Sequence, residues 1–246
     1  MPDGGELVRR DEVTDVLARL SEADLDRRER SRLLLRFAGL IGAGARAAGA
    51  RAAVSGKWLT EAVADTAPHI PVRDLLTLRQ HHGGRSGDEL AESLIASAAR
   101  TTAAIGAVGG AIASAELVAP PALLAAPVQL AAETVAVVAV ELKLVAELHV
   151  VYGRAPLGTR SQVATAYLMS WAGKRGIDTS AGAPSLASVL GTAARSQLRS
   201  RVLRRLGRNV TTMAPFLAGA LAGAELNRRE TRSLGEKLRN DLRRRR

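Results

Sequence analysis

The stretch APPALLAAPVQLAAETVAVVAVELKLVAELHVVYG, residues 119–153, decides the fold, because it is either a membrane span or the buried centre of a helical bundle. A helix that crosses a bilayer alone needs about 20 apolar residues. The uncharged runs of this chain cover residues 101–115, 117–132 and 210–224, so each has only 15 or 16 residues. The sequence therefore argues against a simple span.

The second half of this stretch carries four charged residues on one side of the predicted helix: Glu133, Glu141, Lys143 and Glu147. At about 100° per residue they fall within a sector of roughly 160°, and the opposite side is apolar apart from His149. This pattern favours a helix with a partner on each side. Two interpretations stay open: the charges pair with Arg from other helices at the edge of a soluble bundle, or the tip of a hairpin around 104–128 dips into a membrane.

The composition and the breakers around the stretch predict an all-α protein. Ala, Leu and Arg favour helix, and aromatic residues make up only 2% of the chain. The capping box at Ser86 and Glu89 begins one helix, and Pro120 and Pro121 end it. A second helix then covers 122–152, with Gly153 as its C′ residue. We therefore expect a helical bundle around a long antiparallel hairpin, 88–152, with packed C-terminal helices.

The remaining segments divide the chain into three parts that we expect to form one compact domain. Residues 1–65 are predicted as amphipathic N-terminal helices, 66–87 as a loop-rich connection and 88–246 as the main helical domain with a basic tail. Within that domain, Thr159 and Gln162 form a second capping box for a helix to about 174. Further helices are predicted over 185–206 and 212–243. Small-residue spacings at Gly106/Gly110 and Gly219/Gly223 predict close helix crossings.

The positive charge is concentrated in the last fifth of the chain. Residues 194–209 hold six Arg and no acid, and residues 225–246 hold nine Lys or Arg and four acids, which together account for the formal net charge of +11. Such a local excess predicts a polyanionic partner. The predicted contact residues are Arg199, Arg201, Arg204, Arg205, Arg208, Arg243, Arg244, Arg245 and Arg246.

Three interpretations of this basic region stay open. An anionic membrane surface is favoured, because the adjoining residues 211–224 are apolar and uncharged. Nucleic acid is the less favoured partner, because few aromatic residues are present to stack on bases. The third interpretation is a soluble helical scaffold or protein-interaction module whose basic face is simply solvated. The sequence leaves the identity of any protein partner and the oligomeric state open.

No catalytic, cofactor or metal motif is recognisable, so we expect a protein that is not an enzyme. The G-x-G-x-x-A match at 42–47 follows a helical pattern rather than a strand, and the chain has no cysteine. The enzyme alternative would need buried carboxylates that share a pocket. The candidate buried polar residues are Glu116, Glu133, Glu141, Glu147 and Asn227.

Two segments resemble a known family. They are ELKLVAELHVVYG, residues 141–153, which follows a Gly-rich apolar segment, and MAPFLAGALAGAELNRRETRSLGEKLRNDL, residues 213–242. Together they resemble the EcsC family of bacterial helical proteins, and more narrowly its actinobacterial members, over roughly 88–242. The resemblance implies association with the membrane and no established enzymatic activity. The N-terminus lacks the apolar segment of a secretory signal peptide, so we expect a cytoplasmic protein at the inner face of the cell membrane.

Overall fold

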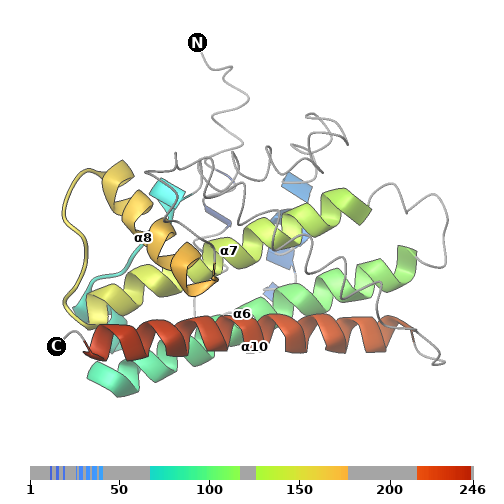
Figure 1. The fold of residues 1–246 in the computed structure, drawn as a ribbon. Coiled ribbons are helices and arrows are strands. Elements are labelled where there is room, and N and C mark those ends of the chain that lie inside the picture. Colours follow the sequence, from blue (N-terminus) through green and yellow to red (C-terminus); the bar gives the residue numbers. More distant parts are fainter. Residues whose placement is uncertain are drawn as a thin grey trace, which may run out of the picture.

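The computed structural model describes residues 67–116, 126–176 and 215–244, together with scattered positions between 12 and 40. Side chains are described for the scattered positions between 12 and 40, for 67–107 except His69, for 133–176 and for 221–244. These parts are helical and contain no strand, which confirms the predicted all-α class. The elements, shown in Figure 1, are η1 (Ala67–His69), α5 (Leu75–His81), α6 (Gly87–Glu116), α7 (Ala126–Val151), α8 (Arg160–Lys174) and α10 (Pro215–Arg244). The predicted helix over 185–206 lies outside the described residues.

The predicted hairpin is formed by α6 and α7. Helix α6 begins at Gly87, one residue before the predicted start, and α7 ends at Val151, as expected from Gly153. At that end, the Gly153 amide donates to the Val150 carbonyl at 3.0 Å, and the Arg154 amide donates to the His149 carbonyl at 2.7 Å. Gly153 has a φ of +65°, so a Schellman motif ends the helix.

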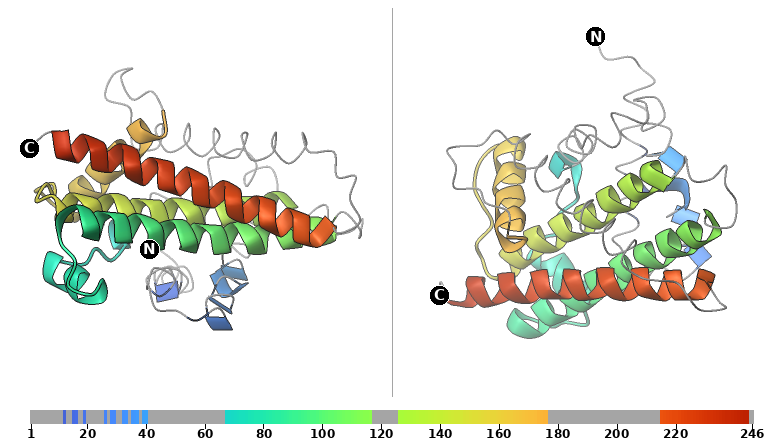
Figure 2. Two further views of the ribbon diagram at one scale, coloured as in Figure 1. Left: turned by 90° about the horizontal axis from the view of Figure 1, so that it is seen from below. Right: turned by 45° about the vertical axis from the view of Figure 1, so that its right-hand side comes forward.

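Helix α7 forms the centre of the described bundle. All sixteen residues from 133 to 148 are buried, and no other described segment has so long a buried run. Helices α6, α8 and α10 all contact α7 (Figures 1 and 2). The sequence predicted such a helix with partners on several sides, because one face is apolar and the other combines charged and apolar residues. The predicted pairing with Arg forms, because Glu141 pairs with Arg175 and Glu147 with Arg73. The predicted location at the edge of the bundle was wrong, because the two carboxylates are 0% and 3% exposed.

Helices α6 and α10 run antiparallel in the closest contact of the fold. Glu92 pairs with Arg239 near one end, and the Thr102 hydroxyl donates to the Asn227 carbonyl further along. At Gly106 and Gly223, a Cβ on either residue would collide with the backbone carbonyl of the other. The small-residue spacing predicted a close helix crossing, and Gly106 and Gly223 form one. The side chains around Gly110 and Gly219 lie outside the described residues.

Two shorter helices complete the described part of the bundle, and one of them, α8, packs against α7. The capping box of α8 forms as predicted: Thr159 accepts from the Gln162 amide, and Gln162 Oε1 accepts from the Thr159 amide at 2.8 Å. Helix α5 differs from the expected loop-rich connection. Its N-cap is Asp74, whose carboxylate accepts from the Thr77 amide at 2.8 Å, and Leu78 packs in the core.

Candidate functional site

Glu141 is a fully buried carboxylate at the centre of the bundle, and its partners come from two other helices. Trp171 Nε1 of α8 donates to Glu141 Oε2 at 2.9 Å, and the Thr231 hydroxyl of α10 donates to Oε1 at 2.8 Å. The Arg175 guanidinium, just after α8, pairs with both carboxylate oxygens and also contacts Glu230 at 3.4 Å. The charge of Glu141 is therefore neutralised inside the core, and the group ties α7, α8 and α10 together.

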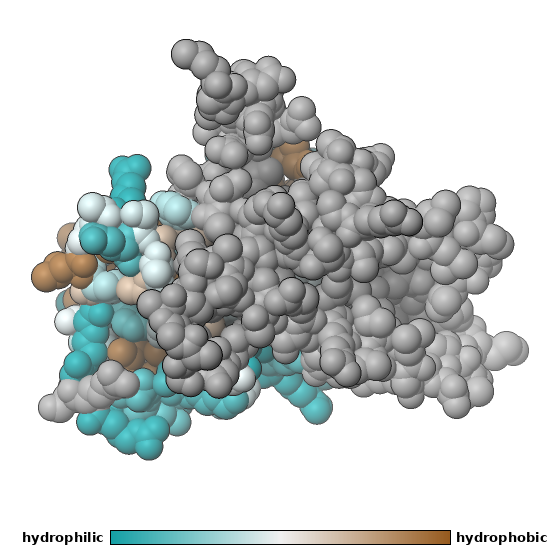
Figure 3. Space-filling model, turned by 45° about the horizontal axis from the view of Figure 1, so that its top comes forward, coloured by the Kyte–Doolittle hydropathy of each residue, from teal (hydrophilic) through white to brown (hydrophobic). Residues whose placement is uncertain are grey.

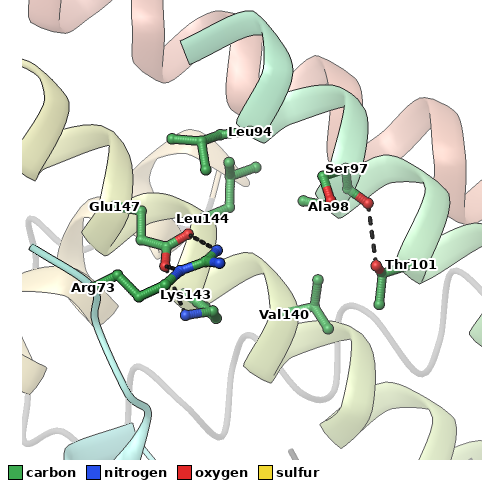
Figure 4. A pocket seen from close by; sticks show the side chains of 9 residues that line it. All are labelled: Arg73, Leu94, Ser97, Ala98, Thr101, Val140, Lys143, Leu144 and Glu147. Carbon is green, nitrogen blue, oxygen red and sulfur yellow. Dashed lines mark hydrogen bonds and ion pairs between the residues drawn. The ribbon is translucent and has the colours of Figure 1, made fainter. Parts of the chain in front are cut away.

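Glu147 is the second buried carboxylate, and a different set of cations holds it. Arg73 Nε and Nη2 donate to its two oxygens at 2.8 and 3.2 Å, which is a bidentate pair. Lys143 Nζ, one turn earlier on α7, donates to Glu147 Oε1 at 2.7 Å and to the Pro71 carbonyl at 2.7 Å. These bonds fasten the segment before α5 onto α7 (Figure 4).

A small pocket lies beside Glu147, between α6 and α7. Figure 4 shows its lining, which is completed by Leu94, Ser97, Ala98, Thr101, Val140 and Leu144. Its volume of ≈ 20 Å³ is enough for about one water molecule and far too small for a metabolite.

The remaining buried polar candidates form a third group. Asn227 Nδ2 donates to the Thr102 carbonyl at 3.1 Å and to Glu133 Oε1 at 3.3 Å. Asn227 and Glu133 are 1% and 9% exposed, so the amide bridges α6, α7 and α10 inside the bundle. The side chain of Glu116 lies outside the described residues.

The described carboxylates of these three groups do not share a pocket. Each described carboxylate candidate is held by donors of the protein, and the pocket is lined by only one of them, Glu147. Within the described parts, no three His, Asp or Glu side chains are grouped as they would be to hold a metal ion. These buried hydrogen bonds and ion pairs are suited to holding the helices in one specific packing arrangement.

His82 is a buried polar residue that the sequence did not single out as a core group. Its Nδ1 lies 2.8 Å from Ser93 Oγ of α6, and its Nε2 is buried and makes no hydrogen bond among the described residues. Burial lowers the pKa of His82 below its usual value of 6.5, and the nearby Arg73 guanidinium lowers it further. His82 therefore fastens α5 to α6 in its neutral form. Two adjacent histidines, His81 and His82, before a Gly pair gave no sign that one of them is buried.

One end of the bundle carries exposed apolar and basic side chains together. Helix α5, the loop between α7 and α8 and the last turns of α10 lie at this end (Figures 1 and 2). We call it the end surface and define it by its exposed apolar and basic side chains: Val72, Leu75, Leu76, Leu157, Arg85, Arg160, Arg243 and Arg244. Two carboxylates, Asp74 and Asp88, are exposed at the same end. Figure 3 shows apolar atoms projecting among hydrophilic ones in this part of the molecule.

Contacts with the half-exposed Asp88 of α6 link two elements of the end surface. The Tyr152 hydroxyl, just after α7, donates to Asp88 Oδ1 at 2.6 Å, and Arg243 Nε lies 3.3 Å from Asp88 Oδ2. Of the predicted polyanion contacts, the structure describes Arg243 and Arg244, which are both exposed. Arg199, Arg201, Arg204, Arg205, Arg208, Arg245 and Arg246 lie outside the described residues.

Comparison with known proteins gives no match to a family model, to a curated protein or to a solved structure. In the parts that the structure describes, no helix combines the length and the apolar character needed to cross a bilayer.

Proposed function

We propose that this protein is a non-enzymatic helical accessory protein that binds anionic lipid through its basic C-terminal region, at the inner face of the cell membrane. The resemblance to the EcsC family is part of the basis for this proposal. The observation that carries it is the end surface, where Arg243 and Arg244 are exposed on the last turn of α10, at the same end of the bundle as the exposed Leu76 and Leu157. Basic and apolar side chains on one face suit the headgroup and acyl layers of a bilayer.

The interior of the bundle supports a binding role over a catalytic one. Glu141 and Glu147 are neutralised by Arg175 and by Arg73 with Lys143, so these ions stabilise the packing. Residues 225–246 hold nine Lys or Arg and four acids, and these interior pairs use none of that excess. Each Lys or Arg near an anionic bilayer contributes about 1 kcal/mol to binding.

The test is co-sedimentation of the full chain with vesicles of phosphatidylcholine alone and with added phosphatidylglycerol. We expect binding only to the anionic vesicles, with release by high salt because the attraction is screened. The double variant Arg243→Gln with Arg244→Gln should bind about 30-fold more weakly, since two charges near the surface are lost.

Arg228→Gln with Arg229→Gln is the matched control. It removes the same charge from exposed positions of the same helix, about 22 Å from the end surface at 1.5 Å per residue. Equal loss of binding in both double variants would mean that only net charge matters. Retention on DNA at low salt without vesicle binding would overturn the proposal in favour of nucleic acid. Binding to neither would favour the soluble scaffold.

A further inference from the structure

The loop between α7 and α8 presents one apolar side chain almost entirely to solvent. Leu157 is 97% exposed, the highest value among the exposed large hydrophobic residues of the described parts. Its chain neighbours are Pro156 and Gly158, neither of which covers it. A single exposed leucine is common, but one that projects fully from a braced loop is well placed for contact with an apolar partner.

The loop is fixed at both ends, so Leu157 has a defined position. The Schellman motif at Gly153 holds the first end, and the capping box of Thr159 and Gln162 holds the second. Gly158 has a φ of +137°, and a Cβ there would lie 2.7 Å from Gln162 Oε1. Pro156 restricts its own φ to about −65°. The apex is therefore presented by a short, pre-organised turn.

The charge around Leu157 is entirely positive along the chain. Arg154 and Arg160 lie three residues before and after it, and residues 148–177 contain no Asp or Glu. On the same end surface, α10 presents Arg243 and Arg244. A projecting leucine between arginines matches a bilayer interface, where the apolar side chain enters the acyl boundary and the cations remain among the phosphates.

We propose that Leu157 is the membrane-inserting residue of this protein and that the end surface faces the bilayer. This inference rests on the proposed function and adds the insertion site and the orientation to it. The bilayer fits better than a protein groove, because Leu157 is 97% exposed on a loop whose nearest charged residues in the chain, Arg154 and Arg160, are both cations. The acyl chains would cover Leu157, and the headgroups would pair with the arginines.

The chain has no cysteine, so a single introduced thiol gives a clean probe. The full-length variant Leu157→Cys is labelled with an environment-sensitive fluorophore and mixed with vesicles containing phosphatidylglycerol. Leu221→Cys is the comparison variant, because Leu221 is 71% exposed on α10 and lies about 35 Å along that helix from Arg244. It belongs to the apolar residues 211–224, so a spectral shift at 221 instead of at 157 would overturn the proposed orientation. We expect a blue shift and quenching by lipid-borne quenchers at 157, and the spectrum of the free protein at 221.

Affinity gives an independent measurement on unlabelled protein. Leu157→Ser should lower the vesicle affinity about tenfold, because the burial of one leucyl side chain is lost, whereas Leu221→Ser should leave it unchanged. Equal helical circular dichroism of both variants shows that folding is unaffected.

The outcomes separate the two proposals. Vesicle binding with a probe at 157 that stays in water overturns the insertion site but leaves the proposed function standing. A failure of the unlabelled wild-type chain to bind any vesicle overturns both. A spectral shift at 157 that needs an added protein fraction, and does not occur with protein-free vesicles, overturns the lipid assignment of Leu157.

Discussion

At the scale of single residues, the buried carboxylate of Glu141 depends on several specific partners. Its carboxylate accepts from Trp171 and Thr231 and is neutralised by Arg175, whose side chain is only 11% exposed. Glu141→Gln would leave the Arg175 charge inside the bundle with only the longer contact to Glu230. We expect a loss of about 3 kcal/mol in the free energy of unfolding, measured by urea denaturation.

The control for this variant is Glu225→Gln. Glu225 also pairs with two arginines, Arg228 and Arg229, but on the exposed surface of α10. Solvent screens such pairs, so the unfolding midpoint should change little. Equal midpoint shifts for the two variants would contradict the assignment of Glu141 as a buried structural ion.

The sequence predicted the buried acids but not their partners. Charges within a long apolar pattern are informative by themselves, which is why Glu141 and Glu147 could be named. Arg175 and Arg73 lie 34 and 74 residues away in the chain and sit in ordinary polar surroundings. Only the three-dimensional packing of α7 against α8 and the segment before α5 selects them from the many arginines.

At the scale of helices, the crossing of α6 and α10 depends on Gly106 and Gly223. A methyl group on Gly106 would collide with the Gly223 carbonyl, and backbone cannot turn away as a side chain can. Gly106→Ala should therefore push the helices apart and destabilise the protein by about 1–3 kcal/mol, measured by urea denaturation.

Gly173→Ala is the matched substitution. Gly173 is also a helical glycine, but a Cβ there would meet nothing within 4 Å. Alanine has the better helix propensity, so this variant should gain about 0.5–1 kcal/mol. Destabilisation by both variants would show that loss of glycine itself, and not the crossing, is responsible.

The ends of helices were predictable from the sequence where the capping interactions involve only residues close together in the chain. The capping box at Thr159 and the C′ glycine at 153 each need only neighbouring residues, and both form. Helix α5 was missed because its seven residues lie between a Pro-containing segment and a Gly-rich turn. Its stability comes from tertiary contacts such as Leu78 in the core and His82 against Ser93, which no local pattern reveals.

At the scale of the whole molecule, composition was enough for the fold class and the location of the excess charge. A chain rich in Ala, Leu and Arg and poor in aromatic residues favours helix throughout, and the described parts are helical. Composition could not show which surface combines charge with exposed apolar groups. The end surface arises because α5, the loop after α7 and the end of α10, which are far apart in the sequence, meet at one end of the bundle.

The same end of the bundle holds two groups that set how stability depends on pH. His82 has a folded pKa below 6.5, so the unfolded chain binds its proton more tightly, and stability falls as the pH drops below about 6.5. Burial and the hydrogen bond to Asp88 raise the pKa of Tyr152 from 10.0 to about 12. The unfolded chain therefore loses the phenolic proton first, and stability falls as the pH rises from 10 towards 12.

We therefore expect the free energy of unfolding to be level between about pH 6.5 and 10, and to decline on both sides. Urea denaturation across this range measures it. His82→Gln should reduce the acid decline, and Tyr152→Phe the alkaline one, although each variant also lowers the plateau by removing a hydrogen bond. His81→Gln, at the exposed neighbouring position, is the control and should keep both slopes. An acid slope that survives His82→Gln would show that other groups govern the response, and that α5 is not held by a neutral imidazole.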